Sequence, residues 1–127
     1  MRKTSTIFIT AASLLLLVGT ILGAVGSHAL ADKLTPQQLN SWELGVQYHL
    51  VHGLGIILIA TLYEQWHEPL LRWAGSLMLI GVFLFSGTIY GTKLFLPTSF
   101  GVMAPFGGLS FMLGWLLLAI SALKQRS

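Results

Sequence analysis

Four apolar stretches dominate the sequence, and each is long enough to cross a membrane. They cover residues 7–26, 44–63, 70–95 and 105–123. The hydrocarbon core of a bilayer is about 30 Å thick, which takes about 20 apolar residues in a helix. Backbone polar groups in lipid must be satisfied within the protein, which favours helices. The sequence therefore predicts an all-α, integral membrane four-helix bundle that forms a single domain, residues 1–127.

The composition supports a membrane protein and excludes several classes of function. Of the 127 residues, 54% are hydrophobic and 9% are charged, whereas soluble domains carry roughly 25% charged residues. The chain has no cysteine, which excludes thiolate catalysis, disulfide exchange and cysteine-ligated clusters. The net charge of +3 comes from basic residues at the ends of apolar stretches. That pattern orients a membrane protein, so we expect no nucleic-acid partner.

The amino-terminal segment also has features of a cleaved signal peptide. Arg2 and Lys3 precede the first apolar stretch, and residues 29–31 (ALA) have the form of a cleavage site. The apolar stretch is nevertheless about twice as long as the core of a typical signal peptide. We therefore expect the segment to be retained as the first membrane span.

The distribution of basic residues predicts the orientation. With four spans, one side of the membrane holds Arg2, Lys3, Arg72, Lys124 and Arg126. The other side holds only Lys33 and Lys93. Basic residues are enriched on the cytoplasmic side of membrane proteins. We therefore expect a multi-pass protein of the inner (plasma) membrane with both termini in the cytoplasm.

A helix start is visible after the first span. Thr35 is a good N-cap, Pro36 suits the first helical position, and Gln38 completes a capping box. We expect a short interfacial helix to begin at Pro36 before the second span. This helix could either run straight on into the span or be separated from it by a bend.

Glycine spacing indicates close helix packing. Residues 19–23 read GTILG and residues 87–91 read GTIYG, an internal similarity that is consistent with two helical hairpins in parallel repeat. Glycines four residues apart allow helix backbones to approach closely. The candidate packing residues, within one chain or between chains, are Gly19, Gly23, Gly87 and Gly91. A glycine-lined pore is the functional alternative.

Polar residues gather near the outer half of the second span. His49 and His52 lie one helical turn apart, and His52 is about 12 Å into the span. Ionisable residues at such depth must find partners inside the bundle. The candidate polar cluster is His28, Glu43, Gln47, Tyr48, His49 and His52.

Three interpretations of this cluster are open. The favoured one is a hydrogen-bonded network of neutral histidines that joins the helices. The second is a polar binding pocket or a proton-linked path. The third is a metal or haem site, because imidazoles three residues apart can share a ligand. No nucleophile with a base and no phosphate-binding loop is recognisable, so we expect neither catalytic residues nor a bound metal or cofactor.

Several segments resemble those of a known family. They are residues 23–30 (GAVGSHAL), 39–43 (LNSWE), 47–52 (QYHLVH), 85–90 (FSGTIY), and 105–108 (PFGG) through Gly114-Trp115. Together they resemble the YgdD/YwdK family of small multi-pass membrane proteins. The resemblance covers most of the chain and implies a four-helix inner or plasma membrane protein with no established activity.

These observations lead to a functional hypothesis in three versions. The leading version is a non-enzymatic protein of the membrane with a structural, accessory or small-partner-binding role. The first alternative is a small oligomeric transporter or channel with a histidine-lined path, and the second is a haem- or quinone-linked redox subunit. The expected partners are the lipid bilayer and either further copies of the chain or another membrane protein.

Overall fold

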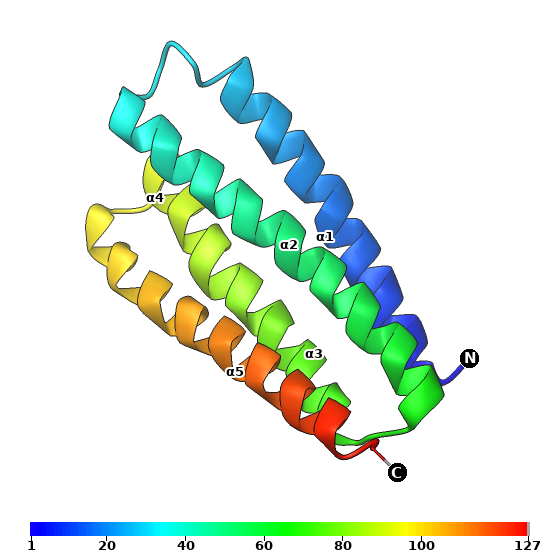
Figure 1. Ribbon diagram of the computed structural model, residues 1–127. Helices are drawn as coiled ribbons and strands as arrows, with labels where there is room; N and C mark the ends of the chain where they lie inside the picture. The colour runs from blue at the N-terminus through cyan, green and yellow to red at the C-terminus, as the bar shows by residue number, and fades with distance from the viewer. Residues whose placement is uncertain (127) are drawn as a thin grey trace.

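The computed structural model describes residues 1–126, which form helices joined by short loops (Figure 1). The elements are α1 (Lys3–Ser27), α2 (Pro36–Trp66), α3 (Leu70–Gly81), the π-helical segment η1 (Val82–Gly87), α4 (Thr88–Leu94), the 3-10 segment η2 (Thr98–Met103) and α5 (Ala104–Leu123). The π-helical segment joins α3 to α4 without a break, so these three elements form one long helix. No strand occurs within the described residues.

Four helical segments are long and apolar enough to cross a membrane. They are Lys3–Ser27, Pro36–Trp66, Leu70–Leu94 and Thr98–Leu123. Each contains 25 residues or more, which exceeds the length that the hydrocarbon core requires. The predicted all-α fold with four membrane-spanning helices is confirmed.

The start of α2 follows the capping pattern in the sequence. The Thr35 side chain accepts a hydrogen bond from the Gln38 backbone N–H, and the Gln38 side chain accepts one from the Thr35 N–H. The helix then continues to Trp66 without interruption. Of the two alternatives, the structure shows the straight continuation: residues 36–43 are the first turns of α2, because no breaker follows Pro36.

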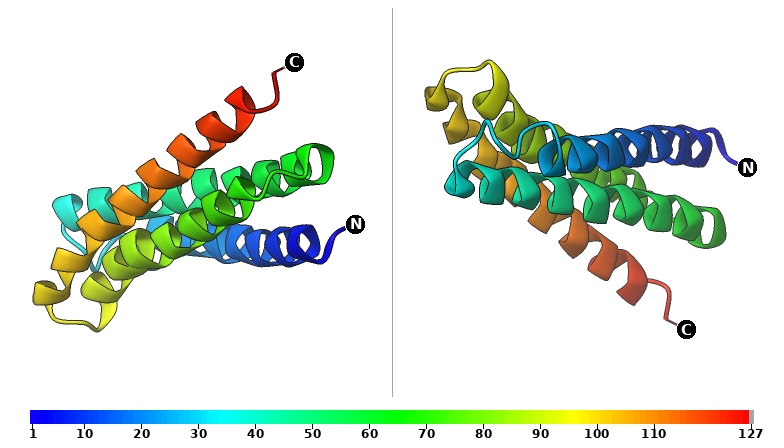
Figure 2. Two further views of the ribbon diagram at one scale, coloured as in Figure 1. Left: turned by 90° about the horizontal axis from the view of Figure 1, so that it is seen from below. Right: turned by 90° about the horizontal axis from the view of Figure 1, so that it is seen from above.

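The chain forms two helical hairpins that run in the same sense (Figures 1 and 2). The first is α1 with α2, and the second is α3–η1–α4 with α5. Both chain termini lie at one end of the bundle, here called the terminal end, and the opposite end is called the distal end. Helix α2 packs against α1 within the first hairpin and against α3, η1 and α4 of the second. The main cluster of buried apolar side chains lies toward the terminal end and includes Phe8, Ile56, Ile59, Tyr63, Leu71 and Met78.

Glycines allow the helices to approach closely at several points. A Cβ atom on Gly75 of α3 would lie 2.5 Å from the Phe8 ring of α1, and one on Gly114 of α5 would lie 2.9 Å from the Met78 side chain. Such distances are shorter than any real contact. Each glycine therefore provides the space that the facing side chain fills.

The π-helical segment lies where two glycines face it. Ser86 is fully buried, and its hydroxyl donates to the Gly45 carbonyl of α2 at 2.6 Å. On the other side, a Cβ atom on Gly107 of α5 would lie 2.7 Å from the Phe85 Cβ. Segments of π-helix often mark functional or closely packed sites. Here the segment is wedged between α2 and α5.

Two carboxylates, Glu64 in the last turn of α2 and Glu68 in the connection to α3, hold the chain ends. Glu64 accepts hydrogen bonds from the Ser5 hydroxyl at 2.7 Å and from the Arg2 backbone N–H at 3.0 Å. Glu68 accepts from the Leu70 N–H at 3.2 Å and pairs with Lys124 at 3.3 Å. The carboxylates thus satisfy free N–H groups at the starts of two helices. Glu64 also joins α2 to the start of α1, and Glu68 joins the α2–α3 connection to Lys124 after α5.

The contact between Gly75 and Phe8 yields a prediction about stability. Replacing Gly75 with alanine forces the buried Phe8 ring away from α3, and such overpacking costs about 1–3 kcal/mol. A Cβ atom at Gly108 meets no atom within 4 Å, so Gly108→Ala is the matched control and should be neutral or slightly stabilising. Unfolding in detergent micelles measures both variants. Equal stabilities would show that the α1–α3 contact is not tight.

Candidate functional site

His49 connects α2 to two other helices. The side chain is 2% exposed. Its Nε2 lies 2.7 Å from the Leu15 carbonyl oxygen of α1, and its Nδ1 lies 2.9 Å from the Tyr90 hydroxyl of α4. A carbonyl oxygen only accepts, so Nε2 carries the proton and Nδ1 of the neutral ring accepts from Tyr90.

His52 connects α2 to the remaining helix, α5. Its Nδ1 donates to the Tyr48 carbonyl oxygen one turn earlier, at 2.8 Å, and its Nε2 accepts from the Trp115 indole N–H at 2.9 Å. The His52 ring also stacks on Phe111, with centroids 3.6 Å apart. The two histidines together join α2 to α1, α4 and α5.

The hydrogen-bond partners determine the charge state that fits His52. An indole N–H can donate but cannot accept. The Nε2 atom must therefore be the unprotonated acceptor, and His52 is neutral in this arrangement. Protonation would place two N–H donors against each other and break the bond to Trp115.

Gly19 gives His49 access to the backbone of α1. The Leu15 carbonyl that His49 binds lies one turn before Gly19. A Cβ atom on Gly19 would lie 3.1–3.2 Å from the imidazole of His49 and 2.8 Å from the Leu50 side chain. Any larger residue at position 19 would push α2 away. The absence of a side chain therefore allows this bond to form.

The rest of the predicted polar cluster is more dispersed. His28 and Glu43 are exposed and make no side-chain hydrogen bond or ion pair within residues 1–126. Gln47 is exposed on α2. The Tyr48 ring is 40% exposed and lies 5.8 Å from the His52 ring. The structure thus brings Tyr48, His49 and His52 into contact with the bundle interior but leaves the other three at its surface.

The four glycines predicted to pack between helices have different surroundings. Gly19 and Gly23 face Leu50 and Val46 of α2, whereas Gly91 faces Leu96 in the loop after α4. At Gly87, a Cβ atom would come no closer than 4.0 Å to any atom, and the nearest one belongs to its own helix. Three of the glycines are thus covered by the chain itself.

The histidine rings are directed to different neighbours rather than to a common point. Among the residues that the structure describes, no three His, Cys, Asp or Glu side chains gather in a way that would hold a metal ion. The metal or haem interpretation would require His49 or His52 to give up one of its bonds.

Sequence reasoning missed the partners of the histidines. Tyr90, Phe111 and Trp115 lie on other helices, and Trp115 is 63 residues from His52. Aromatic residues are common near membrane interfaces, so nothing distinguished these three.

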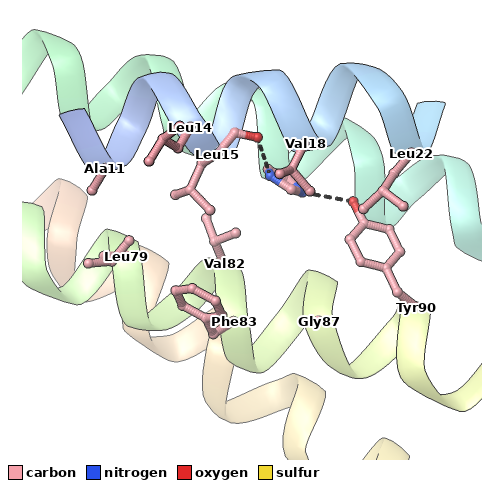
Figure 3. Close-up of a pocket in the computed structure, with 11 residues that line it drawn as sticks. Ala11, Leu14, Leu15, Val18, Leu22, Leu79, Val82, Phe83, Gly87 and Tyr90 are labelled. Atoms are coloured by element: carbon pink, nitrogen blue, oxygen red, sulfur yellow. Dashed lines mark hydrogen bonds between the residues drawn. The ribbon is translucent and has the colours of Figure 1, made fainter. Parts of the chain in front are cut away.

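A groove opens on one side of the histidine pair, between α1 and α3–η1–α4 (Figure 3). Its volume is about 460 Å³. Apolar side chains of both walls point into it, and the bond between His49 and Tyr90 lies within it (Figure 3). The lining includes Ala11, Leu15, Val18, Leu22, Phe83 and Gly87. This space is called the α1–α4 groove below.

A second groove lies on the other side, between α2 and α5. Its volume is about 610 Å³. Its walls carry more polar groups, because Gln47, Tyr48 and His52 contribute to them together with Trp115. This space is called the α2–α5 groove. The histidine pair therefore stands between two grooves of different polarity.

Four apolar helices joined by a buried polar network define a small multi-pass helical membrane protein. Residues 22–108 match the model of a family described as "Protein of unknown function (DUF423)". The chain belongs to this family.

Two relatives share one family name, and the match covers nearly the whole length of each. A UPF0382 membrane protein of Staphylococcus haemolyticus is 37% identical over 118 residues, which cover 93% of this chain and 96% of the relative. The UPF0382 membrane protein YwdK of Bacillus subtilis is 36% identical over 119 residues, which cover 93% and 95%. The resemblance to the YgdD/YwdK family is thereby confirmed. No solved structure shows a significant match to the chain.

The bond between Trp115 and His52 can be tested by removing its donor. Trp115→Phe keeps an aromatic ring but leaves the Nε2 atom of His52 without a partner. We expect a loss of about 1 kcal/mol, the usual size for such a bond. Trp73→Phe is the control, because Trp73 is 65% exposed. Unfolding in detergent measures both. A loss that is no larger for Trp115→Phe would argue against the network.

Proposed function

We propose that the protein is a non-catalytic component of the inner (plasma) membrane with a structural or accessory role. In this role, the histidine pair holds the bundle together and the grooves offer binding surfaces to lipid or to another membrane protein. The observation that carries the proposal is that all four ring nitrogens of His49 and His52 have partners within the bundle. A histidine in this state has no free nitrogen with which to relay a proton or bind a substrate.

The alternatives require changes that this arrangement opposes. A proton path through His52 would have to break the bond from Trp115 each time the ring is protonated. A haem- or quinone-linked subunit would have to redirect an imidazole that is already bonded on both sides. Purified protein with a visible absorption band or a bound quinone would favour the redox alternative.

Proton flux distinguishes the accessory role from transport. Proteoliposomes that contain the protein should lose an imposed pH gradient no faster than protein-free liposomes, because His52 is locked in its neutral form. A pH-sensitive dye inside the vesicles reports the gradient, and His52→Gln is the matched variant. Faster collapse with the wild type than with His52→Gln would instead support a histidine-lined path.

The orientation is supported by the basic residues at the terminal end, which include Arg2, Arg72 and Lys124. Cytoplasmic termini place the distal end at the outer face. We expect a reporter that fluoresces only in the cytoplasm to be active when fused after residue 126, and a reporter active only outside to work when inserted in the 28–35 loop. The reverse pattern would overturn the orientation.

A further inference from the structure

The α1–α4 groove has the chemistry of a site for a hydrocarbon chain. Its lining is apolar except for His49 and Tyr90, and those two side chains bond to each other. A polar solute would therefore find little to bind. We propose that the groove binds one acyl chain of an anionic phospholipid from the leaflet at the distal end, with the lipid phosphate at Lys93.

The dimensions of the groove favour a single chain over a helix of another protein. Its walls run from Ala11 to Leu22 and from Leu79 to Tyr90, which is about 16 Å at the helical rise. A volume of about 460 Å³ over that length gives a cross-section of about 30 Å². A helix with side chains is about 10–12 Å across, so only part of its width could enter so narrow a groove. An extended hydrocarbon chain is only one methylene wide.

An uncovered glycine marks the same groove. Every other glycine of α1 to α4 has an atom of a neighbouring residue within about 3.3 Å of the position that a Cβ would take. At Gly87 no atom lies closer than 4.0 Å, and the space belongs to the groove. Gly101 and Gly108 are open in the same way, and Gly108 lines the α2–α5 groove. Glycine in a helix interior costs backbone entropy, and close packing is the usual compensation in membranes. An acyl chain would supply the contact that the protein does not.

Lys93 provides the charge for the head group. It lies in the last turn of α4, three residues after Tyr90 and therefore on the same side of the helix. Among residues 1–126, its ammonium group has no carboxylate within ion-pair distance, and the ion pair that does form joins Lys124 to Glu68. A lysine at a membrane interface extends its head toward lipid phosphates. Lys93 thus stands about one turn beyond the distal end of the groove.

This inference adds a ligand to the accessory role proposed above and rests on it only for the placement in a membrane. Proton conduction would overturn the accessory role without affecting the groove. Conversely, a stable bundle that binds no lipid would overturn the groove site alone.

Native mass spectrometry tests the proposal on the delipidated full chain in detergent. The probe is an equal mixture of phosphatidylglycerol and phosphatidylcholine with identical acyl chains. We expect the wild type to retain one phosphatidylglycerol in preference to phosphatidylcholine. Gly87→Leu places a side chain in the groove at a position where a Cβ atom meets no atom closer than 4.0 Å, and it should reduce retention about tenfold. The matched control is Gly108→Leu, which adds the same side chain to the α2–α5 groove.

Two further variants keep the test decisive. Val18→Trp fills the groove from the α1 wall and should act like Gly87→Leu, which covers the case that the latter does not fold. Lys93→Gln should abolish the preference for the anionic lipid. Equal retention by wild type and both groove-filling variants, or a wild type without preference between the lipids, would show only surrounding bulk lipid and overturn the proposal.

Discussion

The arrangement of the bundle depends on the need to satisfy polar groups where no water is present. His49 and His52 are buried on α2, and each ring nitrogen has a partner within the described chain. In lipid, the alternative to such a bond is an unsatisfied polar group, and each interhelical bond contributes about 1 kcal/mol. Because three of the four partners lie on α1, α4 and α5, the two side chains fix how α2 is rotated against these helices. Apolar packing in a membrane lacks this directionality.

The glycines complement the histidine pair. Gly19 exposes the Leu15 carbonyl to His49, Gly45 makes room for Ile89 of α4, and Gly107 makes room for the π-helical segment. At the terminal end, Glu64 and Glu68 perform a comparable task by binding groups of α1 and α5. The bundle is thus tied at its middle and at one end. The groove between α1 and α4 stays open, because no protein side chain occupies the space beside Gly87.

The sequence predicted those features that depend on neighbouring residues. Helix lengths follow from apolar stretches, and the start of α2 follows from Thr35 and Gln38, whose bonds are local. The burial of His49 and His52 inside the bundle followed from their depth in the second span. Their partners could not be predicted, because Tyr90 and Trp115 are 41 and 63 residues away in sequence. The π-helical segment likewise depends on contacts with Gly45 and Gly107. The spacing of the glycines could not show that the space beside Gly87 is open whereas the space beside Gly19 is occupied by side chains of α2, because those contacts come from other parts of the chain.

The central claim is that two neutral histidines, each in a fixed tautomer, join the helices. Nuclear magnetic resonance of protein labelled with ¹⁵N-histidine measures the state of each ring nitrogen in a bilayer, and His49→Gln and His52→Gln assign the signals. The account predicts a proton on Nε2 of His49 and on Nδ1 of His52, with both rings neutral from neutral to mildly acidic pH. A proton on Nε2 of His52, or a charged His52 ring, would contradict the bond from Trp115 and with it the account of the bundle.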